Sequence, residues 1–226
     1  MRALLLSLLF LLGAPSLFAN YDWAANAWEK VSESEGIDVY RKSFKDSNVK
    51  GVAGSALINA SVDKIVWVLM DHEHKSQWVD KIQYSKTLAK PTPLTSIQYA
   101  TFGMPFPVSD RDFVYSYKFS YDKTKNMILV DVVSVEHRSQ PASSTIGVRG
   151  EITMGKFRLY PKNAGKKTYV EVEYLADPKG LLPSWVVNIV QKKWPYKTLS
   201  GLRKQVKKKF VGSSRLVTEG LKVPLK

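Results

Sequence analysis

The clearest pattern in the sequence is an alternation between residues 112 and 121, where every second position is aromatic. Successive side chains of a strand point to opposite faces, so this spacing predicts a strand with one aromatic face. Other apolar runs bounded by turn residues predict further strands. They cover residues 37–42, 49–58, 82–88, 94–102, 127–136, 145–154, 157–160 and 167–176. Their connections are short, which favours antiparallel pairing.

Three segments near the N-terminal end have helical spacing instead. A helix is expected over residues 21–33, where Trp23 and Trp28 fall on one apolar stripe. A second helix is expected to begin after Ser61, a residue type that caps helix N-termini. Residues 71–80 are expected to form a third, short helix.

The longest predicted element is an amphipathic helix from Pro183 to Phe210, with an expected kink at Pro195. Its apolar face begins with Trp185 and Ile189 and continues beyond the kink at spacings of three and four. The opposite face is basic, and the segment contains no acidic residue. Its cations are Lys192, Lys193, Lys197, Arg203, Lys204, Lys207, Lys208 and Lys209.

The order of the predicted elements places the chain in the α+β class. A curved antiparallel sheet of about nine strands is expected to surround the long C-terminal helix, which leaves an internal hydrophobic cavity between them. No internal repeat or linker is present, so one domain is expected over residues 20–211. Residues 212–226 begin with glycine and serine and are expected to form a loose tail.

The first residues have the three-part layout of a secretory signal peptide. Met1 and Arg2 give a positive start, residues 3–12 are mostly apolar, and the small residue Ala19 ends the segment. We therefore expect residues 1–19 to be removed and the protein to be exported, to the periplasm of a bacterium or otherwise by secretion. The apolar run is short for a bilayer span, and a retained membrane anchor is the alternative.

Composition narrows the chemistry and the partners. The absence of cysteine excludes disulfides, thiol catalysis and thiolate metal sites. The formal net charge of +14 indicates an anionic partner. For an exported protein this partner is expected to be an anionic membrane surface, contacted peripherally, and not nucleic acid. A DNA-binding module is the alternative.

Several motifs resemble the START (StAR-related lipid transfer) domain, and their order and spacing match it from about Trp23 to Phe210. They include Val66-Trp67-Val68-Leu69-Met70-Asp71, Pro107-Val108-Ser109-Asp110-Arg111-Asp112-Phe113-Val114 and Asp177-Pro178-Lys179-Gly180-Leu181-Leu182-Pro183. The resemblance implies a helix-grip fold, in which a curved sheet grips a long helix around a lipid-sized tunnel. It also implies that one lipid, sterol or other hydrophobic ligand is carried or sensed. No cofactor is indicated, and a monomer is expected.

The resemblance places the loop from Met104 to Arg111 beside the C-terminal helix at the tunnel mouth, where the two would gate it. The expected lipid-binding residues are Met104, Phe106, Arg111, Phe113, Tyr115, Tyr117, Gln98, Ser134, Val172, Trp185 and Ile189. Sterol-transfer members hold the sterol hydroxyl with an acidic and a basic residue. The nearest positions here are Gln98 and Tyr117, so sterol specificity is not carried over.

Phe106 and Arg111 each allow a second interpretation. Phe106 lies between Pro105 and Pro107, which limit the conformations of the loop, and it matches an apolar residue that touches the membrane in family members. The alternative is that Phe106 caps an ordinary core. Arg111 either meets a polar headgroup or fixes the base of the loop through an ion pair.

Lysines of the C-terminal helix are expected to contact an anionic membrane together with Phe106. Each cation near such a membrane adds about 1 kcal/mol of attraction. The alternative is an ordinary solvated face. The lysines are Lys192, Lys193, Lys197, Lys204, Lys207 and Lys208.

Candidate catalytic groups are few. His72 and His74 share a short spacing without a third metal ligand nearby, and His137 next to Glu136 is expected to stabilise a turn. No nucleophile motif or phosphate loop is present. We therefore expect a lipid-binding or lipid-transfer protein with no catalytic or metal-binding residues. The alternative is a helix-grip enzyme, a cyclase or hydrolase acting on a hydrophobic substrate.

Overall fold

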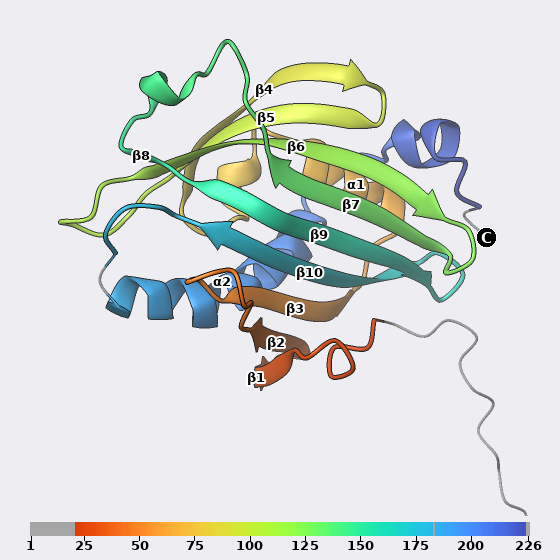
Figure 1. The fold of residues 1–226 in the computed structure, drawn as a ribbon. Helices are drawn as coiled ribbons and strands as arrows, with labels where there is room; N and C mark the ends of the chain where they lie inside the picture. The colour runs from red at the N-terminus through yellow and green to blue at the C-terminus, as the bar shows by residue number, and fades with distance from the viewer. Residues whose placement is uncertain (1–20, 183, 225–226) are drawn as a thin grey trace, which may run out of the picture.

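The computed structural model describes residues 21–182 and 184–224, with side chains defined outside residues 184, 185 and 187–192. Within these ranges ten strands form one sheet in the order β1-β2-β3-β10-β9-β7-β6-β5-β4, with β8 pairing with β6 (Figure 1). All strand pairs are antiparallel except β6 with β8. The strands are β1 (Glu29–Ser34), β2 (Ile37–Lys42), β3 (Gly51–Ile58), β4 (Ile82–Thr92), β5 (Thr95–Phe102), β6 (Arg111–Asp122), β7 (Met127–Ser134), β8 (Val148–Arg149), β9 (Glu151–Lys162) and β10 (Lys167–Asp177).

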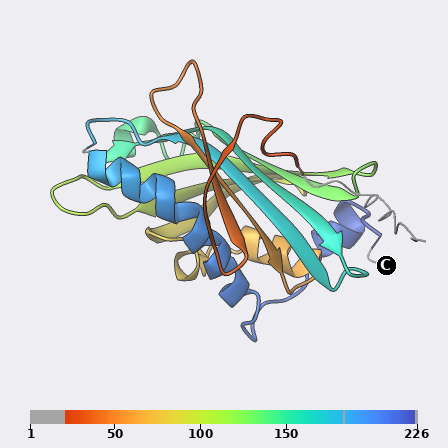
Figure 2. The ribbon, with the colours of Figure 1, turned by 90° about the horizontal axis from the view of Figure 1, so that it is seen from below.

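The long helix α2 lies against β2 and β3 (Figure 2). The approach is close because Gly54 on β3 has no side chain, and a Cβ there would come within 3.0 Å of Leu199 and 3.1 Å of Pro195. No helix within the described ranges is both long and apolar enough to cross a membrane. The helical segments are α1 (Val62–Met70), η1 (Lys75–Gln77), η2 (Ala142–Ser144), α2 (Ser184–Gln205) and η3 (Leu216–Gly220).

The main core lies between the inner face of the sheet and the two α-helices. Ile65 of α1, Leu199 and Leu202 of α2, and Val172 of β10 are all completely buried in it. Burial of such aliphatic side chains contributes about 1.5–3 kcal/mol each. The predicted α+β class, the curved antiparallel sheet and the C-terminal helix are thereby confirmed.

The prediction of a helix over residues 21–33 is wrong. The chain makes turns up to Trp28 and then forms β1, which pairs with β2. Trp23 stacks on Tyr40 at 4.8 Å between ring centroids, and both tryptophans bury themselves on the outer face of the sheet around Ala53. The apolar stripe therefore reflects two tryptophans that pack against strands, and tertiary packing overrides the local helical spacing.

Three predicted boundaries also need correction. The short helix expected over residues 71–80 is limited to the single 3₁₀ turn η1. The strands expected at 145–154 and 157–160 are instead the two-residue β8 and one continuous strand, β9. Helix α2 ends at Gln205 and does not reach Phe210. Val206 and Val211 are both buried, and the chain turns between them to reach the core.

The C-terminal tail is not loose as far as residue 224. Ser214 donates its backbone N–H to the carbonyl of Asp63 at 3.2 Å. Val217, Leu221 and Val223 are buried in the main core beyond this contact. The segment of glycine and serine after residue 211 therefore connects to a short helical segment, η3, that packs back onto α1.

Candidate functional site

The inner face of β6 is a continuous aromatic surface, as the alternation predicted. Phe113, Tyr115, Tyr117 and Phe119 are at most 8% exposed. Tyr115 and Tyr117 contact edge to face at 5.6 Å between centroids, and Tyr117 stacks on Phe119 at 6.3 Å. Lys118, whose side chain points to the other face of the strand, is exposed.

A lysine lies against this aromatic surface inside the protein. Lys75, from the turn η1, is only 1% exposed. Its Nζ lies 4.7 Å from the ring centroid of Tyr117 and 5.9 Å from that of Tyr115. It also donates a hydrogen bond of 2.5 Å to the Oε1 atom of Gln98, a residue of β5 that is itself 1% exposed.

Burial controls the protonation of this cluster. It lowers the pKa of Lys75 to about 7, an effect that the charge of Asp71 partly opposes. Burial raises the pKa of Tyr117 to about 12 and raises that of Tyr115 and Tyr174 well above the usual value. The tyrosines therefore stay neutral near pH 7, whereas Lys75 titrates there.

Other residues predicted to line the interior lie outside the cluster around Lys75. Val172 is completely buried on the inner face of β10. Ser134 accepts the backbone N–H of Ile152 at 2.8 Å, so its hydroxyl joins β7 to β9 where their ladder has ended. The side chains of Trp185 and Ile189 lie outside the described residues.

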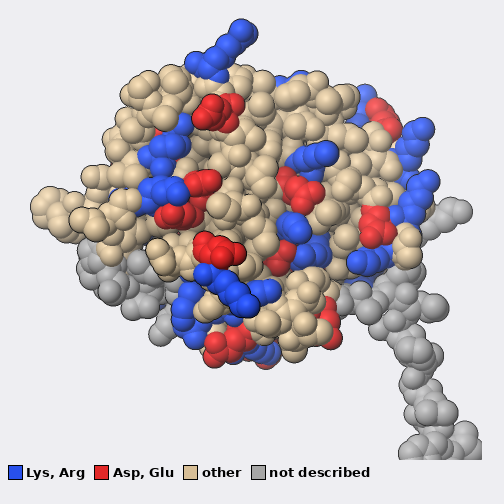
Figure 3. All heavy atoms as spheres, in the orientation of Figure 1, with Lys and Arg blue, Asp and Glu red and all other residues tan. Residues whose placement is uncertain are grey.

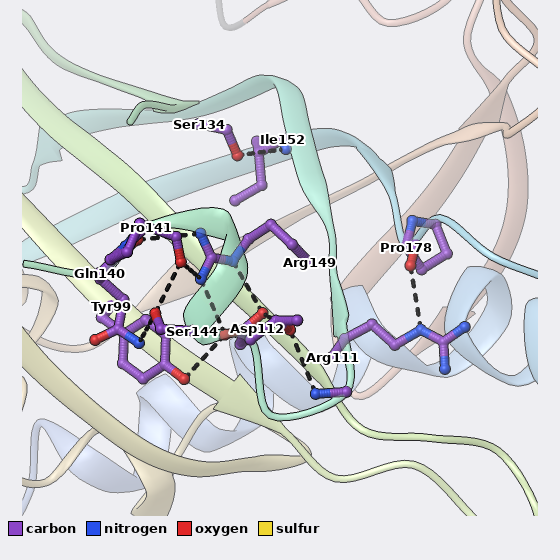
Figure 4. A network of polar contacts seen from close by, with 12 residues as sticks. Tyr99, Arg111, Asp112, Ser134, Gln140, Pro141, Ser144, Arg149, Ile152 and Pro178 are labelled. Carbon is purple, nitrogen blue, oxygen red and sulfur yellow. Dashed lines mark hydrogen bonds and ion pairs between the residues drawn. The ribbon is translucent and has the colours of Figure 1, made fainter. Parts of the chain in front are cut away.

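Arg111 joins two loops at one end of the molecule (Figure 4). Its Nε donates to the carbonyl of Pro178 at 3.1 Å and one terminal nitrogen donates to the carbonyl of Lys179 at 3.0 Å. The other terminal nitrogen donates to the carbonyl of Ser109. This geometry corresponds to the second interpretation, a residue that fixes the base of the loop, although the partners are carbonyl oxygens and not an acidic residue.

The neighbouring Asp112 anchors a further loop from the opposite side of the strand. It is fully buried and accepts hydrogen bonds from Arg149 at 2.9 and 3.2 Å, from Thr145 at 2.8 Å and from Tyr99 at 3.0 Å (Figure 4). These charge-assisted bonds lower the pKa of Asp112 despite its burial. The start of β6 is thus fixed in position, which gives the adjacent loops a rigid base.

Two large apolar side chains project from the loops that Arg111 joins. Phe106 is 94% exposed and Leu181 is 99% exposed. Met104, at the base of the first loop, is half-buried and donates its backbone N–H to Asp110 at 2.7 Å. Residues 103–108, the projecting part of the loop that carries Phe106, include no charged residue (Figure 3). The alternative in which Phe106 caps a core is wrong, because almost none of its surface is covered.

The basic residues of the C-terminal segment differ in their contacts and exposure. Lys197 lies 3.1 Å from Asp80, and Lys208 donates to Gln77 at 2.5 Å. Lys193, Lys204 and Lys207 are exposed, whereas the side chain of Lys192 lies outside the described residues. Because α2 has 22 residues and spans about 33 Å, its C-terminal lysines lie a helix length away from the Phe106 end (Figure 1).

A curved antiparallel sheet that grips a long C-terminal helix over an apolar, aromatic interior defines a helix-grip protein. A family model of the START domain matches residues 15–209. The chain therefore belongs to the START domain family, as its motifs indicated. Family membership supports lipid binding as its general activity.

Relatives in sequence and in structure agree with this assignment. The protein PA1579 of Pseudomonas aeruginosa is 28% identical over 189 residues, which cover 82% of this chain and 89% of that protein. The phosphatidylcholine transfer protein of Bos taurus is 29% identical over 168 residues, covering 72% of this chain and 76% of the relative.

Among solved structures, a STAR-related lipid transfer protein from Xanthomonas axonopodis has a TM-score of 0.67 and 27% identity, with 80% of this chain and 99% of that chain covered. Human STARD10 has a TM-score of 0.70 at 19% identity, covering 80% and 73% of the two chains, and supports the fold alone.

Sequence patterns missed Lys75 as a candidate site residue. It lies in a charged stretch between Asp71 and Asp80, which resembles an exposed surface. The sequence did offer one signal of burial, the large apolar residue Trp78 only three positions later, which is also buried.

Proposed function

We propose that the protein binds one lipid or similar hydrophobic molecule in its interior and exchanges it with a membrane, without catalysing a reaction on it. The observation that carries this proposal is the inner face of β6, where Tyr115 and Tyr117 surround the buried Lys75. An isolated ammonium is costly to bury, so a core built only for packing would exclude it. A ligand with an apolar body and a polar end would use both parts of this interior.

The names of relatives support the same function. The mammalian relatives are phosphatidylcholine transfer proteins, and the similar bacterial structure is described as a lipid transfer protein. A lipid that leaves water for the interior gains about 0.8 kcal/mol for each buried CH₂. Transfer from a bilayer lacks this gain, so shape and headgroup contacts would determine which lipid is taken.

Exchange with the membrane is proposed to occur at the end that carries Phe106 and Leu181. Exposed aromatic and aliphatic side chains on a rigid base are suited to shallow insertion into a bilayer. The interior face of β6 begins at the same end, because Arg111 opens this strand and holds both loops. An inserted loop would therefore place the lipid exit directly at the membrane.

A catalytic function is less well supported by the described residues. The three histidines are the natural candidates for acid–base chemistry, but none is buried. His74 lies 2.8 Å from Asp71 and stacks on Phe210 at 4.3 Å. These contacts engage its ring outside the aromatic interior.

Export belongs to the proposal as well and rests on the signal-peptide pattern of residues 1–19. A bacterial protein would then shuttle lipid through the periplasm as a monomer. N-terminal sequencing of the protein from the periplasmic fraction would give Asn20 as the first residue. A protein that keeps residues 1–19 in the membrane fraction would contradict export as a free carrier.

Native mass spectrometry of the purified protein with its co-purified lipid tests the proposed function. We expect a one-to-one complex that is lost in a variant with Tyr117→Trp and Val172→Trp, because larger side chains would occupy the interior. Tyr169→Trp on the outer face of β10 is the matched control and should keep the lipid. A wild-type protein that never carries or captures lipid would refute the proposal.

A further inference from the structure

The structure contains a packed segment beyond the part of the chain that the family model matches. The match ends at residue 209, and residues 211–224, which we call the tail, fold back onto α1. The tail begins beside Trp67 of α1, because a Cβ on Gly212 would lie 3.3 Å from the indole nitrogen. Ser214 then donates its backbone N–H to the carbonyl of Asp63 at 3.2 Å. The tail is therefore fixed to one turn of α1 from its first residues.

Apolar side chains hold the rest of the tail in place. Val217 is completely buried, and Leu221 and Val223 are at most 9% exposed. Leu216 is partly buried against the same core. Leu221 donates its backbone N–H to the carbonyl of Leu216 at 2.8 Å. Val223 donates to the carbonyl of Val217 at 3.0 Å, so the tail forms a compact turn. Burial of these four apolar side chains stabilises the tail in this position.

The tail covers one end of the aromatic surface on the inner face of β6. Gly220 lies against Leu94, since a Cβ there would come within 3.3 Å of the Cδ2 atom of Leu94. The carbonyl of Leu94 accepts the backbone N–H of Phe119, the last aromatic residue of this surface, at 2.9 Å. Phe113, the first, lies about 20 Å away along the strand. In Figure 1 the tail, beside the mark C, and the loop from β5 to β6 lie at opposite ends of the sheet.

We propose that the tail is a plug that closes the interior at the Phe119 end and confines lipid exchange to the end that carries Phe106 and Leu181. This inference rests on the proposed lipid-binding function and adds the route by which the ligand enters and leaves. Without the tail, Leu94 and Trp67, which pack against the main core, would meet water at this end. A lipid chain would then have a second exit between α1 and the turn from β4 to β5.

The two ends of the interior present different surfaces to a membrane. The outward side chains of the tail are polar, and the guanidinium of Arg215 lies 3.9 Å from the carboxylate of Glu219. Thr218 is exposed between them. At the other end the exposed side chains are the apolar Phe106 and Leu181. Apolar groups are suited to insertion into a bilayer and charged groups are not, so the plugged end is the one that would remain in water during exchange.

Loosening the plug should make lipid exchange independent of the Phe106 loop. The variant Val217→Ser with Leu221→Ser weakens the burial of the tail, and a fluorescent lipid reports transfer between vesicles. Phe106→Asp should slow transfer several-fold in the wild-type background and no longer slow it in the serine variant, because the lipid has a second exit. Release to albumin, an acceptor without a bilayer, should rise several-fold. Glu219→Gln, exposed on the same segment, is the control and should behave as wild type.

A pair of cysteines tests the plug by holding it closed. The chain has no cysteine of its own, so Leu94→Cys with Gly220→Cys gives one defined cross-link on oxidation. The two positions are close enough for a disulfide, whose Cβ atoms lie about 3.8 Å apart. In the otherwise wild-type chain, the oxidised and reduced proteins should transfer lipid at the same rate, because the plug stays closed during exchange. In the serine variant, oxidation should restore the slowing by Phe106→Asp and the low release to albumin.

The possible failures can be told apart. Ile37→Ala, in β2 near the opposite edge of the sheet from Leu94, lowers stability without touching the tail. If it raises release as much as the serine variant, or if the serine variant keeps the wild-type response to Phe106→Asp, the plug is overturned while lipid binding stands. If the serine variant does not fold, the cysteine pair decides, since transfer that stops on oxidation would place the exit beneath the tail. A wild type that binds no lipid would refute the proposed function itself.

Discussion

The two faces of the sheet both bury charged residues, but they surround them differently. On the outer face, Arg158 donates to Glu173 at 2.6 Å and lies 3.9 Å from Glu171. Glu171 also accepts the backbone N–H of Tyr21 at 3.0 Å and the hydroxyl of Tyr160 at 3.3 Å. On the inner face, the ammonium of Lys75 has the neutral Gln98 as its hydrogen-bond partner.

This difference separates a charge that is paired with carboxylates of the fold from one whose hydrogen-bond partner is neutral. The outer network joins β9, β10 and the N-terminal segment, and the guanidinium of Arg158 lies 4.0 Å from the centroid of the Tyr21 ring. Each member has a partner within the chain. Among the ion pairs of the described residues Lys75 has no acidic partner, so its burial reduces stability.

Replacement of each cation by methionine should have opposite effects on stability. Arg158→Met leaves Glu171 and Glu173 buried without a counter-charge, and should lower the free energy of unfolding by about 3–5 kcal/mol at pH 7. Lys75→Met removes an unpaired charge at similar volume and should leave stability unchanged or increase it. Urea denaturation of lipid-free protein measures both. A Lys75→Met variant as unstable as Arg158→Met would show that the inner lysine is structural.

The pH dependence of stability should also have opposite signs on the two faces. Burial lowers the pKa of Lys75 to about 7 from 10.5, so the unfolded chain binds more protons between these values and stability rises with pH there. Lys75→Met should remove about 2 kcal/mol of this rise between pH 7 and pH 9. The comparison is made with wild type by urea denaturation at each pH.

Glu171, on the outer face, should give stability the opposite dependence on pH. Burial raises its pKa to about 7 from 4.5, so the folded state binds more protons between these values and stability falls as pH rises through this window. Glu171→Gln should flatten the fall by about 2 kcal/mol between pH 5 and pH 7. Equal pH profiles for wild type and both variants would contradict the assigned titrations.

Local patterns in the sequence were sufficient for most strands of the sheet and for the long helix, apart from its end at Gln205. The alternation from Phe113 to Phe119 specifies one buried face regardless of what lies opposite. The same local logic failed for residues 21–33, because Trp23 and Trp28 pack on Tyr40 and Ala53 of other strands. The prediction of a loose tail after residue 211 failed for the same reason, because Val217, Leu221 and Val223 pack on distant parts of the chain.

The polar part of the interior was harder to predict because it depends on contacts between distant residues. Lys75 is buried by Gln98, 23 positions away, and by two tyrosines of β6. Apart from Trp78 and Val79, the residues around it from Asp71 to Asp80 are polar or charged and do not indicate burial. Arg111 was recognised from its motif, but its role depended on carbonyls 67 and 68 positions away.

The exposed apolar residues should affect exchange of lipid but not folding, unlike both buried clusters. Phe106→Asp and Leu181→Asp should each slow lipid transfer between vesicles several-fold, because a carboxylate opposes insertion into the bilayer. The free energy of unfolding should stay within about 0.5 kcal/mol of wild type. A fluorescent-lipid transfer assay and urea denaturation measure the two effects. Normal transfer with a large loss of stability would show that these side chains belong to the fold.

The exposed lysines of the C-terminal segment should have the smallest effect. Lys204 and Lys207 are exposed, whereas Lys197 lies 3.1 Å from Asp80. Each cation near an anionic membrane adds about 1 kcal/mol, and salt screens this attraction within about 8 Å at physiological ionic strength. Reversal of Lys204 and Lys207 to glutamate should therefore weaken binding to anionic vesicles and reduce its dependence on salt.

Reversal of Lys123 and Lys125, exposed in the turn between β6 and β7, changes the net charge equally and serves as the control. Vesicle sedimentation at low and physiological salt measures both pairs. If the control pair weakens binding as much as the C-terminal pair, the attraction comes from the overall charge of +14 and not from a surface beside α2. If only the C-terminal pair matters, a membrane-bound orientation must bring the end of α2 as well as Phe106 near the bilayer, with the helix lying along its surface.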